Sequence, residues 1–274
     1  MIPYDFDYYV PETLKEATDI YGSLQSEGAD PVYYAGGTEI ISRARVFNLR
    51  PGAVIDIKSI PELSGLGTDG DRLFFGAAVT LSDIYESGLF PLLKLAAGRI
   101  ADHTIQVRLT LGGNLAGTII YRETMLPLML SDATIYISSP AGDREASITD
   151  IFSGGKKLKP GELIVRVYVD KRFASLPYAH VKKTKDEKIG YPLVTLAAVY
   201  SDGVMRTAAS GLISYPVRFG DIGLNNMQSA AALAQGLLKE IASPVIEDVS
   251  ASAGYREFVF AKTAENIITE LRRS

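Results

Sequence analysis

The sequence predicts an α+β protein, with a two-lobed domain over residues 1–172 and a C-terminal domain over residues 175–274. Three observations predict it. Helix-like and strand-like segments alternate over residues 1–58, which favours a small parallel sheet with crossover helices. Strand-like runs with proline and glycine breaks fill residues 59–172, which favours a mainly antiparallel sheet. After residue 174, strand-like runs precede amphipathic helices, which favours a three-stranded sheet with helices against it.

The first lobe begins with a helix and a strand. Apolar residues recur at helical spacing between Pro11 and Gly28, at Leu14, Ala17, Ile20, Tyr21 and Leu24. The run "DPVYYAGG" then predicts a short strand that two glycines end. Helical spacing resumes in "TEIISRARVF", and "GAVIDIKSI" predicts another strand.

The pair Gly36 and Gly37 stands where the strand passes into the next helix. Glycine lets the backbone adopt a positive φ there and lets a ligand approach without meeting a Cβ atom. The amides of Gly37, Thr38 and Glu39 would begin the helix, where unpaired N–H groups and the helix dipole favour an anion such as phosphate. The segment lacks the GxGxxG spacing of a Rossmann site and the lysine of a P-loop, so a plain turn is the alternative.

In the second lobe, "RLFFGAAVTLSDI" predicts a strand leading into a helix, and "FPLLKLAAGRIAD" has apolar residues in helical register. "ATIYISS" and "ELIVRVYV" predict strands. Before these two strands, Gly112 and Gly113 follow Thr110 and precede Asn114. A hydroxyl, bare backbone and a carboxamide can donate jointly to phosphate oxygens, whereas a glycine bulge is the alternative. Two such turns in one chain predict a diphosphate held between two lobes.

Beyond residue 174, "YPLVTLAAVYSDGVMRTAASGLISYPVRF" predicts strands joined at an "SDG" turn. Two segments with helical spacing follow, "NMQSAAALAQGLLKEIA" and "SAGYREFVFAKTAENIITELRRS". Neither segment contains a group of residues that suggests chemistry.

Composition excludes several classes of function. A formal net charge of −4 argues against a broad basic surface for nucleic acid or anionic lipid. Lysines cluster in "GGKKLKPG" and "HVKKTKDEK"; such runs are usually solvated, although one lysine in a run can reach an anionic ligand. The chain has no cysteine, which excludes disulfides, thiolate zinc sites, protein-ligated iron–sulfur clusters and a catalytic thiol. His103 and His180 lack metal-ligand spacing, so we predict no metal site.

The N-terminal segment "MIPYDFDYYV" is acidic and aromatic, unlike a secretory leader. No run approaches the roughly 18 apolar residues of a membrane helix. We therefore predict a cytoplasmic protein without membrane insertion.

The two glycine motifs resemble those of the FAD-binding subunit of the molybdenum hydroxylases, a family that includes xanthine dehydrogenase and aerobic carbon monoxide dehydrogenase. The family's first signature is Ala-Gly-Gly-Thr after a strand, here Ala35 to Thr38. The second is Thr-x-Gly-Gly-Asn, here Thr110 to Asn114. The resemblance extends through "FDYYVPETLKEA", "VIDIKSIPELSGL", "GAAVTLSDI" and "DVSASAGYREFVFAK", and so covers nearly the whole chain.

The resemblance implies that FAD lies extended between the two lobes, with its diphosphate on both glycine turns. The implied cofactor-binding residues of these turns are Ala35, Gly36, Gly37, Thr38, Glu39, Ile40, Thr110, Gly112, Gly113 and Asn114. An acidic residue nine positions after the asparagine would bind the adenosine ribose, here Glu123 in place of the more usual aspartate; a solvated loop charge is the alternative. Ile164 would pack against the cofactor, with plain core packing as the alternative.

Two more residues match positions near the flavin ring. The ammonium of Lys182 would stabilise the anionic reduced flavin by Coulomb attraction, a role that Lys183 or Lys185 could also fill. Tyr191 would lie against a ring face and control access to it, with a core tyrosine as the alternative. No side chain is assigned a catalytic role, because the flavin carries the electron chemistry.

The chain departs from the family before the second turn. Where relatives often have Ile-Arg-Asn-x-Gly-Thr, this chain reads "IQVRLT", with Gln106, Val107 and Leu109. The arginine and the glycine are missing, although Arg108 is nearby. We expect different polar anchoring there. Lys185 also stands where relatives commonly have arginine.

The resemblance implies an oxidoreductase subunit that transfers electrons. Its partners would be a molybdopterin-containing large subunit, a two-iron two-sulfur small subunit, and an external acceptor such as NAD+, oxygen or a quinone. Two alternatives stay open: a stand-alone FAD-dependent reductase of the same wider fold, and a scaffold subunit that has lost the cofactor. The first lacks a suitably placed proton donor, and the intact glycine turns argue against the second.

Overall fold

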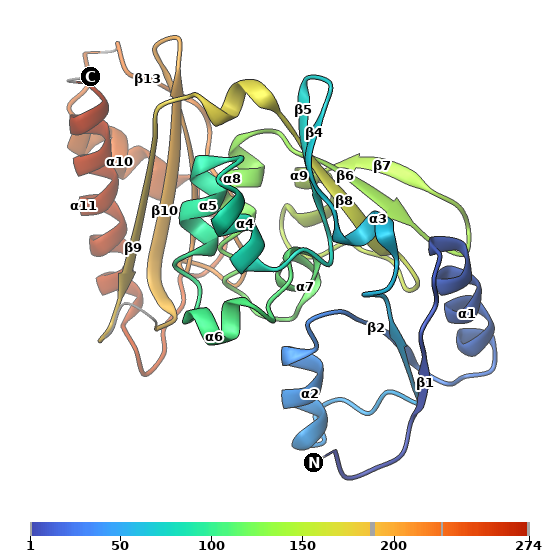
Figure 1. The fold of residues 1–274 in the computed structure, drawn as a ribbon. Coiled ribbons are helices and arrows are strands. Elements are labelled where there is room, and N and C mark those ends of the chain that lie inside the picture. Colours follow the sequence, from blue (N-terminus) through green and yellow to red (C-terminus); the bar gives the residue numbers. More distant parts are fainter. Residues whose placement is uncertain (1, 187–189, 226, 273–274) are drawn as a thin grey trace.

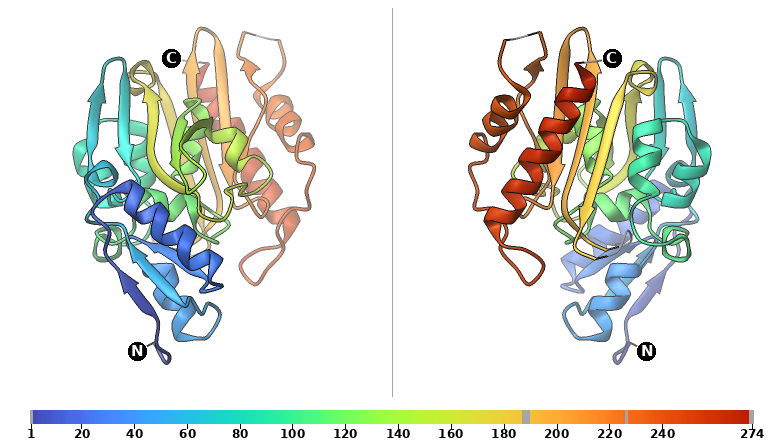
Figure 2. Two further views of the ribbon diagram at one scale, coloured as in Figure 1. Left: turned by 90° about the vertical axis from the view of Figure 1, so that its right-hand side faces the viewer. Right: turned by 90° about the vertical axis from the view of Figure 1, so that its left-hand side faces the viewer.

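Three sheets organise the computed structural model, which describes residues 2–186, 190–225 and 227–272 (Figure 1). The second lobe lies between the first lobe and the C-terminal domain (Figures 1 and 2). None of the described helices is long and apolar enough to cross a bilayer.

The first lobe is a small parallel sheet with crossover helices, as predicted. Its strands occur in the order β1-β3-β2, with β1 (Asp7–Tyr9), β2 (Pro31–Tyr34) and β3 (Ala53–Asp56). The crossovers contain α1 (Leu14–Ser26) and α2 (Thr38–Arg45). The sequence did not predict β1, which has only three residues and exposes two of them.

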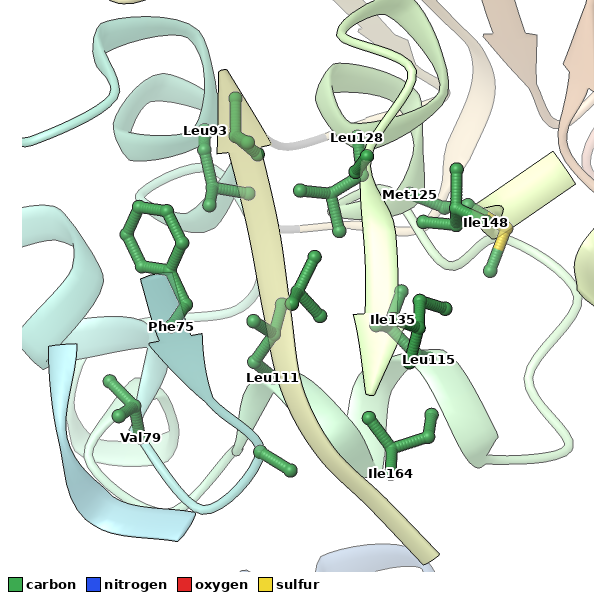
Figure 3. Close-up of a cluster of buried hydrophobic side chains, with 14 of the residues drawn as sticks. Phe75, Val79, Leu93, Leu111, Leu115, Met125, Leu128, Ile135, Ile148 and Ile164 are labelled. Atoms are coloured by element: carbon green, nitrogen blue, oxygen red, sulfur yellow. The ribbon is translucent and has the colours of Figure 1, made fainter. Parts of the chain in front are cut away.

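The second lobe is an antiparallel sheet in the order β4-β5-β8-β6-β7. Its strands are β4 (Leu66–Asp69), β5 (Arg72–Gly76), β6 (Thr134–Ser138), β7 (Arg144–Ser147) and β8 (Leu163–Asp170). Helix α3 (Pro61–Ser64) precedes the sheet, and short helices lie between its strands: α4 (Leu81–Ser87), α5 (Pro91–Ala97), α6 (His103–Gln106), α7 (Leu111–Ala116), α8 (Met125–Leu130) and α9 (Ile148–Phe152). The antiparallel prediction is confirmed. The core lies between this sheet and its helices, where Phe75, Leu111 and Ile135 are fully buried (Figure 3).

The second glycine pair lies inside α7 rather than in a loop or a bulge. Thr110 is the N-cap residue of this helix, and its hydroxyl accepts a hydrogen bond from the Gly113 amide. A threonine N-cap therefore starts the helix despite two poor helix formers in its first turn.

The C-terminal domain follows the short 3₁₀ helix η1 (Lys171–Ala174). Its sheet contains β9 (Tyr178–Thr184), β10 (Pro192–Ser201), β11 (Val204–Ser210), β12 (Val217–Arg218) and β13 (Ile222–Gly223). Within the described residues, the sheet has five strands rather than the predicted three, because β9 precedes the segment for which strands were predicted and two strands of two residues each also pair with β11. Helices α10 (Ala230–Lys239) and α11 (Ala253–Leu271) follow, and α11 packs along one face of the sheet (Figure 2).

The other face of the C-terminal sheet packs against the second lobe. Helix α8 contacts β10 and β11, and α5 contacts β9. In Figure 1 these two helices lie between the two larger sheets. This packing brings side chains of β9 and β10 to the segment that follows α7.

Candidate functional site

The two glycine turns are in direct contact. A Cβ atom added to Gly36 would lie 1.8 Å from the carbonyl oxygen of Arg108 and 3.5 Å from Cγ2 of Thr110. The first turn therefore rests against the segment that enters the second, and only glycine allows so close an approach.

Gly37 is required for a different reason. It is the N-cap residue of α2 with a φ of 67°, in the left-handed region that favours glycine. A Cβ atom there would lie 2.1 Å from the ring of Tyr34. That ring also lies beneath the Lys58 ammonium, 4.5 Å from the ring centroid.

The first turn presents a row of unpaired amides. Within the described residues, the backbone N–H groups of residues 36–40 have no protein acceptor. The next amide, of Ile41, donates to the Gly37 carbonyl at 2.8 Å. These residues are partly exposed. Unpaired N–H groups at the positive end of a helix dipole favour an anion. The structure therefore leaves these donors available, and anion binding at this turn stays a prediction.

The second turn does not present such a row, contrary to the prediction from sequence. The amides of Leu111 and Gly112 donate to the carbonyls of Val79 and Ala77, at 2.9 and 2.8 Å. The Gly113 amide is taken by Thr110 Oγ1, and the Asn114 amide by the Thr110 carbonyl. This turn instead lets a ligand come close to the backbone, because Gly113 is exposed and has no side chain.

Gly112 has a packing role. It is buried, and a Cβ atom there would lie 2.7 Å from the Cβ atom of Ala77. Asn114 is held by its oxygen, which accepts from the Thr124 hydroxyl at 2.6 Å. Its Nδ2 group has no protein acceptor among the described residues and so is available as a donor.

Glu39 joins the two lobes. Its carboxylate accepts from the Thr118 amide at 2.9 and 3.0 Å and from the Thr118 hydroxyl at 2.9 Å. Arg43, one helical turn later, lies 3.5 Å from the same carboxylate. The segment after α7 is thereby fixed against the start of α2.

The altered approach to the second turn is anchored by Gln106. Its Nε2 lies 3.1 to 3.2 Å from the carbonyls of Gly98, Ile100 and Ala101. Gln106 is buried, so its amide anchors the approach to the second turn. That this anchoring differs from the anchoring in relatives stays a prediction.

A buried ion pair joins the second lobe to the C-terminal domain. Lys182 Nζ in β9 donates to Glu123 Oε2 at 2.9 Å and to the Arg99 carbonyl at 2.8 Å. The hydroxyl of Thr195 in β10 donates to the other Glu123 oxygen at 2.8 Å. Both charged side chains are about 5% exposed. Burial raises the pKa of the Glu123 carboxyl, and the Lys182 ammonium opposes that shift.

His180 lies next to this pair. The guanidinium of Arg99 donates to His180 Nδ1 at 2.9 Å, which puts the ring proton on Nε2. That Nε2 is buried without a partner among the described residues. Burial and the positive charges of Arg99 and Lys182 lower the pKa of His180 to about 3.

In the described part of the chain, no three histidine or acidic side chains lie together as metal ligands.

A family model described as the FAD binding domain in molybdopterin dehydrogenase matches residues 4–171. The chain belongs to this family. The predicted family, fold class, FAD cofactor and oxidoreductase class are thus confirmed.

Relatives of this FAD-binding subunit cover most of its length. It is 29% identical over 231 residues to the FAD subunit of nicotinate dehydrogenase from Eubacterium barkeri, which covers 78% of this chain and 77% of the relative. It is 27% identical over 278 residues to the nicotine 6-hydroxylase medium subunit of Paenarthrobacter nicotinovorans, which covers 96% of each.

Solved structures show the same fold. A chain of quinoline 2-oxidoreductase from Pseudomonas putida 86 matches with a TM-score of 0.83 at 24% identity, covering 98% of both chains. A chain of carbon monoxide dehydrogenase from Hydrogenophaga pseudoflava matches with a TM-score of 0.82 at 25% identity, covering 97% of this chain and 96% of that one.

In this subunit, Glu123 and Lys182 do not occupy separate sites. The sequence assigned Glu123 to the adenosine ribose and Lys182 to the flavin ring, which are opposite ends of an extended FAD. Because the two side chains are paired, both assignments hold together only if the pair separates when FAD binds. Glu123 is also not the solvated loop charge that was its alternative.

Ile164 and Tyr191 have opposite surroundings. Ile164 is 3% exposed in the core of the second lobe, which is the alternative considered for it and leaves little surface for a cofactor (Figure 3). Tyr191 is 69% exposed and so is not a core tyrosine; its ring stacks on Tyr121 with centroids 5.1 Å apart. Its place against the flavin ring stays a prediction.

Sequence reasoning missed Arg99, Thr195 and Tyr121. Each contacts a predicted residue, but from another element of the chain. No spacing signal connects them to their partners, so only the packing of β9 and β10 on the second lobe reveals these contacts.

Gly36→Ala should separate the two turns. The new Cβ atom would overlap the Arg108 carbonyl, so we expect the free energy of unfolding to fall by about 1 to 3 kcal/mol in urea titrations. The control is Gly236→Ala in exposed α10, where a Cβ atom meets nothing within 4 Å. That change should raise stability by about 0.5 to 1 kcal/mol. Equal effects of the two changes would contradict the close contact.

Glu123→Gln should leave the Lys182 ammonium buried without its counter-charge. We expect the free energy of unfolding to fall by about 3 kcal/mol. Lys182→Met combined with Glu123→Gln should cost clearly less than the sum of the two single changes, because both charges are then absent. Additive losses in this double-mutant cycle would mean that the two side chains do not interact.

His180 should make the subunit sensitive to mild acid. The unfolded state binds a proton near pH 6.5 and the folded state only near pH 3, so stability is full above pH 6.5 and falls as the pH drops through this window. The slope is at most about 1.4 kcal/mol per pH unit. Glu123, whose folded pKa is raised, acts in the opposite direction.

The test compares urea unfolding of the wild type and His180→Asn between pH 6.5 and 4.5. Asparagine keeps an acceptor for Arg99 but does not titrate. We expect the wild type to lose about 2 to 3 kcal/mol more than the variant over this range. If the unfolding free energies of the wild type and His180→Asn fell in parallel with pH, His180 would not be the group that causes the acid sensitivity.

Proposed function

We propose that this chain is the electron-transferring flavoprotein subunit of a multi-subunit molybdenum hydroxylase. Its partners would be a molybdopterin-containing large subunit and a two-iron two-sulfur small subunit. Bound FAD would supply the step between the iron–sulfur partner and an external acceptor such as NAD+, oxygen or a quinone. Family membership and the medium-subunit relatives support this proposal.

The observation that carries the proposal is the contact between the two glycine turns. We propose that residues 36–40 donate their unpaired amides to the FAD diphosphate. Gly113 would admit the phosphates close to the backbone, and Asn114 would donate from Nδ2. Thr110 and Glu39 hold these groups in place rather than contact the cofactor, because their side chains are already bonded to Gly113 and Thr118.

The buried pair near β9 would serve the other end of the cofactor. We propose that Lys182 keeps the flavin-proximal role and that Glu123 is its counter-charge. This arrangement fits the geometry, since the Glu123 carboxylate and the Arg99 carbonyl together hold the ammonium in a fixed position. A positioned ammonium would favour the reduced, anionic ring by Coulomb attraction.

Gly113→Val should prevent FAD binding while the protein still folds. A Cβ atom at Gly113 meets only the Thr110 hydroxyl, at 2.8 Å, so the new side chain would project into the space proposed for the phosphates. We expect FAD affinity to fall at least about tenfold, measured by flavin fluorescence titration. Gly223→Val is the matched control, because this exposed glycine of β13 has nothing within 4 Å. Undiminished FAD binding by Gly113→Val would remove the support for this site.

The partners are tested by co-purification. A tagged full-length chain, expressed with its neighbouring genes, should bring down polypeptides that contain molybdenum and two-iron two-sulfur clusters. A chain that stays alone, binds FAD and is reduced directly by NADPH would favour the stand-alone reductase instead.

A further inference from the structure

Three consecutive residues at the end of α7 are held by three charged side chains. Lys156 Nζ donates to the Ala116 carbonyl at 2.7 Å, and Arg122 Nη2 donates to the Gly117 carbonyl at 2.7 Å. The next amide, of Thr118, donates to Glu39. With Arg43 on the same carboxylate, we call Glu39, Arg43, Arg122 and Lys156 the α7-end cluster.

The α7-end cluster has more positive than negative charge. It contains three cations and one carboxylate, and that carboxylate pairs with Arg43. In the described part of the chain, neither Arg122 nor Lys156 lies within 4 Å of an acidic oxygen. Burial lowers the pKa of Arg122, and partial desolvation together with the nearby Arg122 charge lowers the pKa of Lys156.

The charged side chain of Arg122 lies in a buried environment that is unfavourable for a charge. It is 7% exposed, and its Nε is buried without a hydrogen-bond partner among the described residues. Its backbone has a φ of 36°, outside the range that most residues prefer. A buried guanidinium that has no carboxylate within 4 Å and shares the more distant Glu39 with two other cations is unfavourable, so an anion supplied from outside would stabilise it.

The cluster lies beside the unpaired amides of the first glycine turn. Glu39 belongs to both groups, since it is the second residue of α2. Helix α7 contacts the first turn at both of its ends. Thr110 lies against Gly36, and a Cβ atom on Gly117 would lie 2.8 Å from Glu39 Oε2. The cations and the amides therefore border the same junction between the lobes.

We propose that Arg122 and Lys156 bind the diphosphate of FAD and supply the positive charge that the second glycine turn lacks. This inference rests on the proposed FAD function. The amides of residues 111–114 are already bonded within the protein, so the amides of the first turn are the only backbone donors of the two turns left for a group with two negative charges. A guanidinium and an ammonium at the same junction complete the cradle by charge-assisted hydrogen bonds.

A purely structural role is the rival explanation. Cations near the last carbonyls of a helix stabilise it through the helix dipole, and both side chains contact such carbonyls at the end of α7. That role affects stability and not the affinity for phosphate, which separates the two explanations.

The test measures dissociation constants of FAD and ADP for the full-length wild type, Arg122→Gln and Lys156→Gln. We expect both ligands to bind about tenfold more weakly to Arg122→Gln and about threefold more weakly to Lys156→Gln. The dependence of affinity on salt concentration should also become shallower, because fewer charges are neutralised. Adenosine has no diphosphate, so its affinity for the two variants should equal its affinity for the wild type.

Lys157→Gln is the matched control. It removes the same charge from the neighbouring exposed lysine, whose side chain has no bonded partner among the described residues, and should leave FAD affinity unchanged. If Arg122→Gln does not fold, the exposed Lys156 decides the question, because its replacement cannot disturb the core. FAD and ADP affinities equal to the wild type in Lys156→Gln, or lower stability with full affinity in Arg122→Gln, would overturn the proposal.

Failure of the proposed function has a different signature. If the wild type binds no FAD, but binds ADP in a way that depends on Arg122 and Lys156, the phosphate site stands and the flavoprotein role is wrong. If the wild type binds FAD and none of the variants weakens it, the flavoprotein role stands and the charge site is wrong. If neither FAD nor ADP binds, both are wrong.

Discussion

The architecture depends on one close backbone contact, between Gly36 and the carbonyl of Arg108. No side chain fits between them, so the parallel lobe and the antiparallel lobe approach to the limit set by backbone atoms. Glu39 then joins the lobes on the other side of the junction through Thr118. The junction between the lobes is consequently made of backbone groups, whose positions vary little with side-chain motion. Groups that are fixed in this way are what a binding site for a charged ligand requires.

The two glycine turns have the same residue types but different physical roles. In the first, positive φ at Gly37 starts a helix and leaves a series of N–H groups without partners. In the second, the Thr110 cap and the carbonyls of Ala77 and Val79 use those groups, so the glycines allow close packing instead. The first turn supplies hydrogen-bond donors, and the second allows neighbouring atoms to come close to its backbone. The positive charge near the second turn comes from side chains outside the turn, Arg122 and Lys156.

Contacts between the second lobe and the C-terminal domain place a carboxylate, an ammonium and a neutral histidine together in a buried layer. Glu123 holds Lys182 and Thr195, and Arg99 holds His180 in its neutral form. Burial and these neighbours shift the pKa values of the Glu123 carboxyl and the His180 ring. The same layer fixes β9 and β10, so the geometry near Tyr191 depends on electrostatic contacts as much as on apolar packing.

The sequence by itself determined the order of most elements, the parallel and antiparallel character of the first two sheets, and the glycine requirement at Gly36 and Gly37. These features depend on the spacing of residue types over a short stretch of chain, because local hydrogen bonds and backbone sterics act between residues that are close in sequence. Through its motifs it also determined the family and the FAD cofactor.

Only the tertiary structure decided which groups meet. It paired Glu123 with Lys182, buried Ile164 in the core, occupied the amides of α7, and brought Arg122 and Lys156 to adjacent carbonyls. Except for Arg122 with Gly117 and the bonds between Thr110 and the amides of α7, these partners lie far apart along the chain, and their contacts arise from how the sheets and helices pack. No local pattern in the sequence encodes such distances, because the free energy that selects them comes from the packing of whole elements.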